Sequence, residues 1–212
     1  MRRTCVLTLF VSLIMSIQCG CGGNGKMPSK TGFLSDYSRL RAVSDSSLQY
    51  VDMQALGRYS QFIVEPVEVY FHGGAKAIEK QTKGRLSEQD IEDLVNYMHD
   101  TVTKTLSDGY TVVYRPGPGV ARIRIALTDI NKSSKAMTLI PQANLTGVGI
   151  GGASMEAEMI DSVTGAQIGA VIASRGGSRI PFSNLGDWKA AKNAMDQWAR
   201  NLKKRIDEAH GR

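Results

Sequence analysis

The clearest hydrophobic pattern in the chain predicts an amphipathic helix that begins after Ser87. Ser87 followed by Asp90 is a variant of the capping box that starts helices, and Gly109 suits a left-handed cap at the far end. Apolar side chains then recur at helical spacing and form one stripe; they are Ile91, Leu94, Val95, Met98, Val102 and Leu106.

A second amphipathic helix is expected over about residues 185–209. Asn184 can cap its start, and Asp187 lies in the first turn, where a negative charge is favourable. One face of this helix is apolar, at Trp188, Ala191, Met195, Trp198, Leu202 and Ile206. The opposite side carries basic residues that we interpret as a solvated face; they are Lys189, Lys192, Arg200, Lys203, Lys204 and Arg205.

Alternating or β-branched segments predict strands, at residues 62–71, 110–115, 120–130, 153–161 and 166–175. The last two flank the turn S-V-T-G and form a predicted hairpin. Pro66 lacks an amide proton and therefore indicates an edge position or a bulge. The alternation points Glu156 and Glu158 outward on one strand and Arg122 and Arg124 outward on another, so pairing of these strands would bring opposite charges together.

The predicted order β-α-β-β-β-β-α indicates an α+β fold, with an antiparallel sheet of about five strands and both amphipathic helices packed on one face. Residues 32–61 have no clear period. We interpret them as a segment that wraps the domain, with a possible helical turn at FLSDYSRL and a short helix that ends near Gly57. The recurrent tyrosines of this region are expected to have half-buried rings and wet hydroxyl groups.

The first twenty residues differ from the rest of the chain. Arg2 and Arg3 precede an uncharged, mainly apolar run over residues 4–17, which is shorter than the ~20 residues that a spanning helix needs. A positive start followed by such a run is typical of a signal peptide. We therefore divide the chain into a removed signal (1–20), a tether (21–31) and one α+β domain (32–212).

The end of this signal resembles that of bacterial lipoproteins, in which a small residue precedes an obligatory cysteine. Cys21 follows Gly20 and fits, whereas Cys19 follows Gln18 and does not; Gln18 also stands where such signals usually have an aliphatic residue. The resemblance implies cleavage between Gly20 and Cys21, with acyl chains, palmitate among them, on Cys21. A metal site or a disulfide at Cys19 and Cys21 is the other interpretation, but no downstream cysteine supplies further ligands.

The tether GGNGKMPSKT is rich in Gly, Ser, Asn and Lys, as flexible linkers are. Gly22 rather than Asp follows the cysteine, which in the lipoprotein class favours the periplasmic face of the outer membrane. The whole chain has a net charge of +6, and its charges are dispersed. No block of like charge indicates a nucleic-acid partner.

Candidate catalytic groups are few. His72 at the end of a predicted strand could form a catalytic set with Asp129 or Ser154, but nothing in the sequence brings them together. His99 and His210 have no metal-binding spacing with it. The glycine-rich GVGIGG at 147–152 precedes a strand rather than a helix, so we interpret it as a loop and not as a nucleotide site. We expect no catalytic residues, no cofactor and no metal.

Several blocks in a fixed order resemble one family, the bacterial lipoproteins known as domain of unknown function 3313. The blocks are GFLSDYSRL (32–40), LQYVD (48–52), IVEPVEVYF (63–71), RPGPGVARIRIALTDI (115–130), GGASMEAEMIDSVTGAQIGAV (151–171) and two tryptophans at 188 and 198. The resemblance implies an envelope lipoprotein and supplies no catalytic residues. We expect a non-enzymatic, outer-membrane-anchored lipoprotein that binds a protein or an envelope polymer. A periplasmic hydrolase using His72, or an accessory lipoprotein of an envelope transport system, are the alternatives.

Overall fold

The computed structural model describes residues 30–70, 87–131, 152–176 and 188–212. The elements follow in the order β1 (Arg41–Ser44), β2 (Ser47–Val51), α1 (Met53–Leu56), β3 (Gln61–Val64), β4 (Glu68–Val69), α3 (Glu88–Ser107), β5 (Thr111–Val112), β6 (Val120–Asn131), β7 (Gly152–Asp161), β8 (Gln167–Gly176) and α6 (Lys189–Ala209). The mixed α+β class predicted from the sequence is confirmed. No helix in the described ranges has the length and apolar character needed to cross a bilayer.

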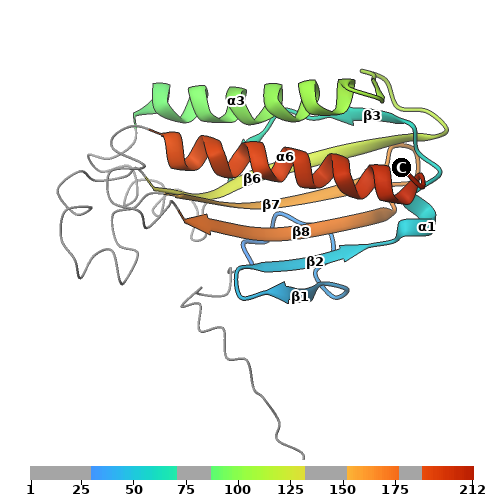
Figure 1. The fold of residues 1–212 in the computed structure, drawn as a ribbon, viewed down its shortest axis with the longest axis horizontal. Helices are drawn as coiled ribbons and strands as arrows, with labels where there is room; N and C mark the ends of the chain where they lie inside the picture. The colour runs from blue at the N-terminus through green and yellow to red at the C-terminus, as the bar shows by residue number, and fades with distance from the viewer. Residues whose placement is uncertain (1–29, 71–86, 132–151, 177–187) are drawn as a thin grey trace, which may run out of the picture.

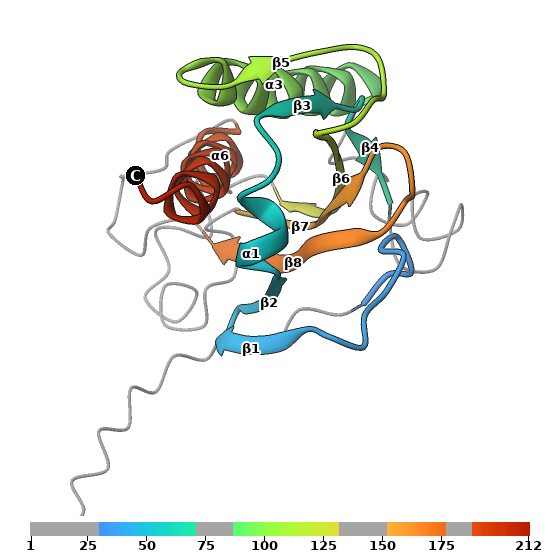
Figure 2. The same ribbon diagram turned by 90° about the vertical axis from the view of Figure 1, so that its right-hand side faces the viewer.

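One sheet of eight strands runs through the molecule, in the order β1-β2-β8-β7-β6-β3-β5, with β4 pairing β6 beside β3 (Figures 1 and 2). The sequence pattern predicts about five strands. The difference comes from the hairpin of β1 and β2, which lies in the segment without a clear period, and from the division of one predicted strand into β3 and β4. Strand β5 keeps only two of the six residues predicted for it.

The structure agrees with the predicted antiparallel pairing at the centre of the sheet. Strands β6, β7 and β8 pair antiparallel over most of their length, and β2 pairs antiparallel with β8. The expectation of an antiparallel sheet is wrong at the other edge, where β3 and β4 pair parallel to β6 and β5 pairs parallel to β3. Pro66 divides the expected strand at this edge, because its nitrogen has no hydrogen to donate to the ladder.

The helices α3 and α6 lie side by side over one face of the sheet (Figures 1 and 2). Ser87 and Asp90 form the predicted reciprocal capping box of α3, and Gly109 has the positive φ, +112°, that favours glycine after a helix. Helix α6 begins at Lys189, and Trp188 at its N-cap makes no side-chain capping bond. The predicted cap residues Asn184 and Asp187 lie outside the described residues.

The short helix α1 confirms the expected turn that ends near Gly57. Asp52 caps it by accepting a hydrogen bond from the Ala55 amide at 2.8 Å. The expected helical turn at FLSDYSRL does not form, and residues 32–39 instead run in turns and bends along the sheet. Gly57 lies close to the end of α6, since a Cβ atom there would be 2.7 Å from the Ala209 carbonyl oxygen.

The two faces of the sheet bury different cores. On the inner face, α6 packs against β7 and β8, and α3 packs against β3, β4 and β5. Their apolar stripes join the sheet in one large cluster, which includes Leu94, Met98, Ile123, Met155, Met195 and Trp198. On the outer face, a smaller cluster forms where Phe33, Leu34 and Leu40 cover Ala126, Ala170 and Ile172. Figure 2 shows α6 and the blue segment that precedes β1 on opposite sides of β7 and β8.

Candidate functional site

A groove of about 500 Å³ lies on the inner face of the sheet, between α6 and strands β1, β2 and β8. Its lining is mainly apolar, with serine, glutamine and asparagine side chains also present; the apolar residues include Val51, Leu56, Ala157, Val171, Trp198 and Leu202. The volume is in the range of about 300–1,000 Å³ that small-molecule sites occupy. We refer to this cavity as the groove.

The floor of the groove is a row of side chains that crosses four strands. Ile125 pairs with Ala157, Ala157 with Val171, and Val171 with Gln49. Ala157 and Val171 stay partly exposed although they lie on the two central strands, whereas Met155 and Met159 beside Ala157 on the same face are each 6% exposed. The small side chain of Ala157 therefore leaves space above the middle of the sheet.

The charged side chains of the groove lining that are exposed to solvent are basic, and we call the edge where they lie the mouth. Among the described residues that line it, Arg175, Lys204 and Arg205 are positively charged. Glu158 is the acidic one, and its carboxylate is bound on the other face of the sheet. Lys204 and Arg205 share a single counterion, Glu208, at 3.8 and 2.8 Å. The groove thus combines an apolar interior with a positive rim.

On the outer face, residues 30–40 form a segment that we call the strap. Two buried carboxylates of β7, Glu156 and Glu158, hold it against the sheet. Glu156 accepts hydrogen bonds from the Thr31 amide, at 2.6 Å, and from the Tyr37 hydroxyl. The Tyr37 oxygen in turn accepts from the amides of Gly32 and Leu34 at 2.8 and 3.0 Å. The first residues of the strap are therefore held by hydrogen bonds to one carboxylate, directly or through the Tyr37 hydroxyl.

Glu158 fixes the middle of the strap. Its Oε2 atom accepts from the Ser35 amide, the Ser35 hydroxyl and the Gln167 side chain at 2.9, 2.6 and 2.9 Å. Its Oε1 atom forms an ion pair with Arg124 at 2.6 Å. Arg124 and Glu158 are paired across β6 and β7, which confirms the expected cross-strand contact of opposite charges. Arg122 instead binds Glu65 at 2.7 Å.

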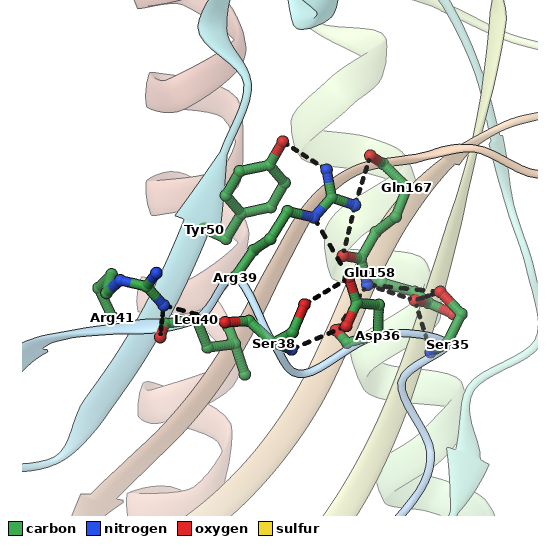
Figure 3. A network of polar contacts seen from close by, with 9 residues as sticks. All are labelled: Ser35, Asp36, Ser38, Arg39, Leu40, Arg41, Tyr50, Glu158 and Gln167. Atoms are coloured by element: carbon green, nitrogen blue, oxygen red, sulfur yellow. Dashed lines mark hydrogen bonds and ion pairs between the residues drawn. The ribbon is translucent and has the colours of Figure 1, made fainter.

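The end of the strap is held by Arg39 (Figure 3). Its guanidinium lies 4.1 Å from the centre of the Tyr50 ring and donates to the Tyr50 hydroxyl at 2.7 Å. It also donates to the backbone and side-chain oxygens of Gln167, at 3.2 Å each. Asp36 binds Arg39 at 3.3 Å and accepts from the Ser38 amide at 2.7 Å. Each part of the strap thus has a directional contact with the sheet or with itself.

The pKa shifts in the strap agree with this bonding. Burial, followed by the hydrogen bond to Glu156, raises the pKa of Tyr37 above 10.0. The amide and the hydroxyl of Ser38 lower the pKa of Asp36 below 3.8.

The prediction that Glu156 and Glu158 face solvent is wrong, because the strap covers them and leaves them 0% and 2% exposed. Their oxygens are occupied by donors, which assigns them to holding the strap.

The site residues expected from the sequence are not brought together in the described part of the chain. Gly20 and Cys21, the GVGIGG loop up to Gly151, and His72 lie outside it. Of the catalytic partners considered for His72, Ser154 donates to Ser174 at 2.9 Å. His99 lies beside Asp100, and His210 packs against Tyr110 with ring centres 5.4 Å apart. The described residues contain no group of His, Cys, Asp and Glu that could hold a metal ion.

The basic side of α6 is partly neutralised by its own carboxylates. Lys203 binds Asp207 at 3.0 Å, and Lys192 lies over the Tyr97 ring at 4.8 Å.

Three tyrosines of the N-terminal region, Tyr37, Tyr50 and Tyr59, are partly buried, as expected. Their hydroxyl groups, however, form hydrogen bonds with protein atoms.

Sequence reasoning missed both the groove and the strap. The strap has apolar residues at Phe33, Leu34 and Leu40 without a helical or strand period, so no pattern places it on the sheet. The sequence does contain one signal for the groove. Small Ala157 interrupts a strand of larger inward residues, Met155 and Met159.

Several solved structures match most of the chain at very low sequence identity and with TM-scores below 0.5. PelC from Paraburkholderia phytofirmans, a dodecamer, is 12% identical, with 76% of this chain and 96% of that chain covered and a TM-score of 0.46. A DUF4136 protein from Bacteroides thetaiotaomicron is 11% identical, with 80% and 98% covered and a TM-score of 0.38. A DUF330 protein from Xanthomonas campestris is 11% identical, with 68% and 82% covered and a TM-score of 0.38.

Among proteins with a curated description, none matches the chain. A family model, by contrast, matches residues 29–202. This range begins one residue before the strap and ends within α6, so it includes the elements on both faces of the sheet. The chain therefore belongs to the family described as "protein of unknown function (DUF3313)".

Proposed function

We propose that the protein is a lipid-anchored lipoprotein of the bacterial envelope, and that its domain binds a partner rather than catalysing a reaction. The N-terminal sequence is the observation that carries this proposal. Two arginines, a short apolar run and Gly20 followed by Cys21 make the order that lipoprotein processing requires. Gly22 after the cysteine supports the periplasmic face of the outer membrane as the destination.

The strap supports a defined orientation of the domain on its anchor. Thr31 is bound to Glu156 on the outer face of the sheet, and it follows Cys21 by ten residues (31 − 21 = 10). A flexible chain of that length has a root-mean-square reach of about 17 Å. The outer face would then lie toward the lipid, and the groove on the inner face would point away from it.

A binding role is favoured over catalysis by the chemistry of the two candidate regions. The buried carboxylates Glu156 and Glu158 have their oxygens occupied by hydrogen bonds from the strap and from Arg124. The groove has a mainly apolar floor, and its exposed charges lie at its mouth. An apolar cavity with a few polar groups at one side is the usual form of a binding site.

The anchor is tested by Cys21→Ala, with Cys19→Ala as the matched control. Cells that express each variant are labelled with an alkyne analogue of palmitate, and the purified chain is weighed by mass spectrometry. We expect Cys21→Ala to abolish labelling and to leave the uncut chain, because the thiol that follows Gly20 at the cleavage position is gone, and Cys5 and Cys19 do not stand at that position. Cys19→Ala should be labelled and cut normally. Normal labelling and cleavage of Cys21→Ala would overturn the proposal.

The binding role is tested by cross-linking the lipidated protein in intact cells and recovering it from detergent-solubilised membranes. We expect a specific partner or envelope component that is lost when the groove is filled by Ala157→Phe. Recovery of the same material with wild type and with Ala157→Phe would contradict a role for the groove.

A further inference from the structure

We propose that the groove binds the single alkyl chain of a free anionic amphiphile, such as a fatty acid anion, with the chain over the sheet and the head group at the mouth. This inference rests on the binding function proposed above and specifies its ligand. It is carried by the apolar row Ile125–Ala157–Val171 on the floor and by the cations Arg175, Lys204 and Arg205 at the rim.

The interior of the groove favours an alkyl chain. Its walls are side chains of the inner core, among them Leu56, Trp198 and Leu202. Transfer of methylene groups from water to such a surface is favourable, and each one buried strengthens binding by about fourfold. A volume of about 500 Å³, in the lower half of the range for small-molecule sites, suits one chain better than a two-chain lipid.

The rim of the groove favours a negative head group. Arg175 is exposed and forms no ion pair with any described residue. Glu208 can balance only one of the two charges on Lys204 and Arg205. The carboxylate of Glu158 faces the strap, so none of the described residues that line the groove directs an acid into it. An anion at the mouth would therefore meet an uncompensated positive charge.

A peptide strand is a poorer occupant of the same space. The floor is the face of a sheet whose backbone groups already pair between strands, from β6 through β7 and β8 to β2. A buried peptide would lose hydrogen bonds to water without finding partners there, which is costly. An alkyl chain has no such groups to satisfy.

The ligand class can be measured on the full lipidated chain in phosphatidylcholine nanodiscs. The chain contains two tryptophans, and Trp198 lines the groove. In a Trp188→Phe background, Trp198 fluorescence reports occupancy during titration with hexanoate, octanoate, decanoate and dodecanoate. We expect affinity to rise about fourfold per methylene until the groove is full. No saturable change with any of these anions would overturn the proposal.

The position of the chain is tested by Ala157→Phe, which places a ring on the floor. We expect it to weaken decanoate binding more than tenfold. Val163→Phe is the matched control, because it introduces the same aromatic ring in the turn between β7 and β8, where the side chain is 65% exposed and outside the groove. Unchanged binding by a folded Ala157→Phe would overturn the assignment to the groove. If that variant does not fold, the chain-length series on the Trp188→Phe protein decides.

The head group is tested by comparing decanoate with neutral decanol, and by Arg175→Gln and Lys204→Gln. We expect each substitution to weaken decanoate binding by roughly threefold, as for other exposed charges, and to leave decanol binding unchanged. Lys104→Gln on the exposed side of α3 is the control and should change neither. Equal binding of decanol and decanoate would overturn the anionic class. Saturable binding of an acidic apolar peptide in place of decanoate would overturn the single-chain amphiphile as the ligand.

A failure of the ligand and a failure of the anchor are distinguishable. Loss of alkyl binding with intact labelling at Cys21 would contradict this inference and leave the lipoprotein function standing. Absence of lipid on the purified chain, with decanoate still bound, would contradict the lipoprotein function and leave the alkyl-binding inference standing.

Discussion

The two faces of the sheet are covered in different ways. On the inner face, α6 packs on β7 and β8 and α3 packs on β3, β4 and β5, and their apolar stripes belong to one large hydrophobic cluster. On the outer face, the eleven residues of the strap (30–40) form no helix, and two buried carboxylates hold them. A helix satisfies its own backbone, whereas an irregular segment needs partners for its amides. Glu156 and Glu158 supply those partners.

This difference shows how one strand serves two faces. Successive residues of β7 point to opposite sides, so Met155, Ala157 and Met159 belong to the inner core and Glu156 and Glu158 to the strap. The inner contacts are non-directional and tolerate a vacancy such as the groove. The outer contacts are hydrogen bonds that depend on angle and distance. We therefore expect mutations on the two faces to differ in size and in pH dependence.

The largest effect is expected for Phe62→Ala on the inner face. Phe62 is 0% exposed and meets the Tyr110 ring edge-on, with centres 5.5 Å apart. Its truncation should lower the free energy of unfolding by about 3–5 kcal/mol. Urea unfolding followed by tryptophan fluorescence measures this. Tyr114→Ala, at a residue that is 91% exposed, is the control, with a change of less than about 0.5 kcal/mol.

An intermediate effect is expected for Glu158→Ala on the outer face. The substitution leaves the Ser35 amide without its acceptor and removes an ion pair, which should cost about 2–3 kcal/mol. The cost stays below that of a fully buried pair because the Arg124 side chain is 29% exposed and keeps Glu65 at 3.7 Å. Limited proteolysis should also cut the strap faster.

The control for this variant is Glu68→Ala, which removes an exposed carboxylate from β4. Its effect should be small. If the two glutamate variants proved equally stable and equally resistant to protease, then apolar contacts alone would hold the strap, and the contrast between the faces would disappear.

The smallest effect is expected for Asp36→Asn, and it should depend on pH. The pKa of Asp36 is lowered from 3.8 in the folded chain, chiefly by the Ser38 amide. A carboxyl group with a lowered pKa contributes stability above its unfolded value, and this contribution is lost as the pH falls through the folded value. Wild type should exceed Asp36→Asn in stability at neutral pH, and the gap should close as the pH falls below 3.8.

Urea titrations of both proteins at neutral and acidic pH measure this gap. Asp45→Asn, in the turn between β1 and β2, is the matched control. A gap that widened toward acid would show that the aspartate strains the strap instead of supporting it.

The periodic elements could be predicted because their patterns are local. The stripe of α3 and its capping box are read from neighbouring residues, and the structure confirms both. The alternation in β6, β7 and β8 is equally regular, and these strands form as expected. The hairpin of β1 and β2 was not predicted, because β1 is exposed along its whole length and has no alternation of buried and exposed residues.

The candidate sites could not be predicted because they depend on contacts between distant segments. Thr31 and Glu156 are 125 residues apart, and Ser35 and Glu158 are 123 apart. Alternation alone points both glutamates away from the helices, but it cannot say whether water or protein lies there. The groove likewise exists only where α6 and β2 leave Ala157 partly uncovered.

The sequence by itself determined the two long helices and the three central strands. Each of these follows from short-range spacing, which fixes the local backbone and the face that becomes apolar. The tertiary structure alone decided that the outer face is closed by a strap and that the inner face keeps a groove with a basic mouth. These features arise from packing between segments far apart in the chain, where side-chain volume and buried hydrogen bonds, not periodicity, select the arrangement.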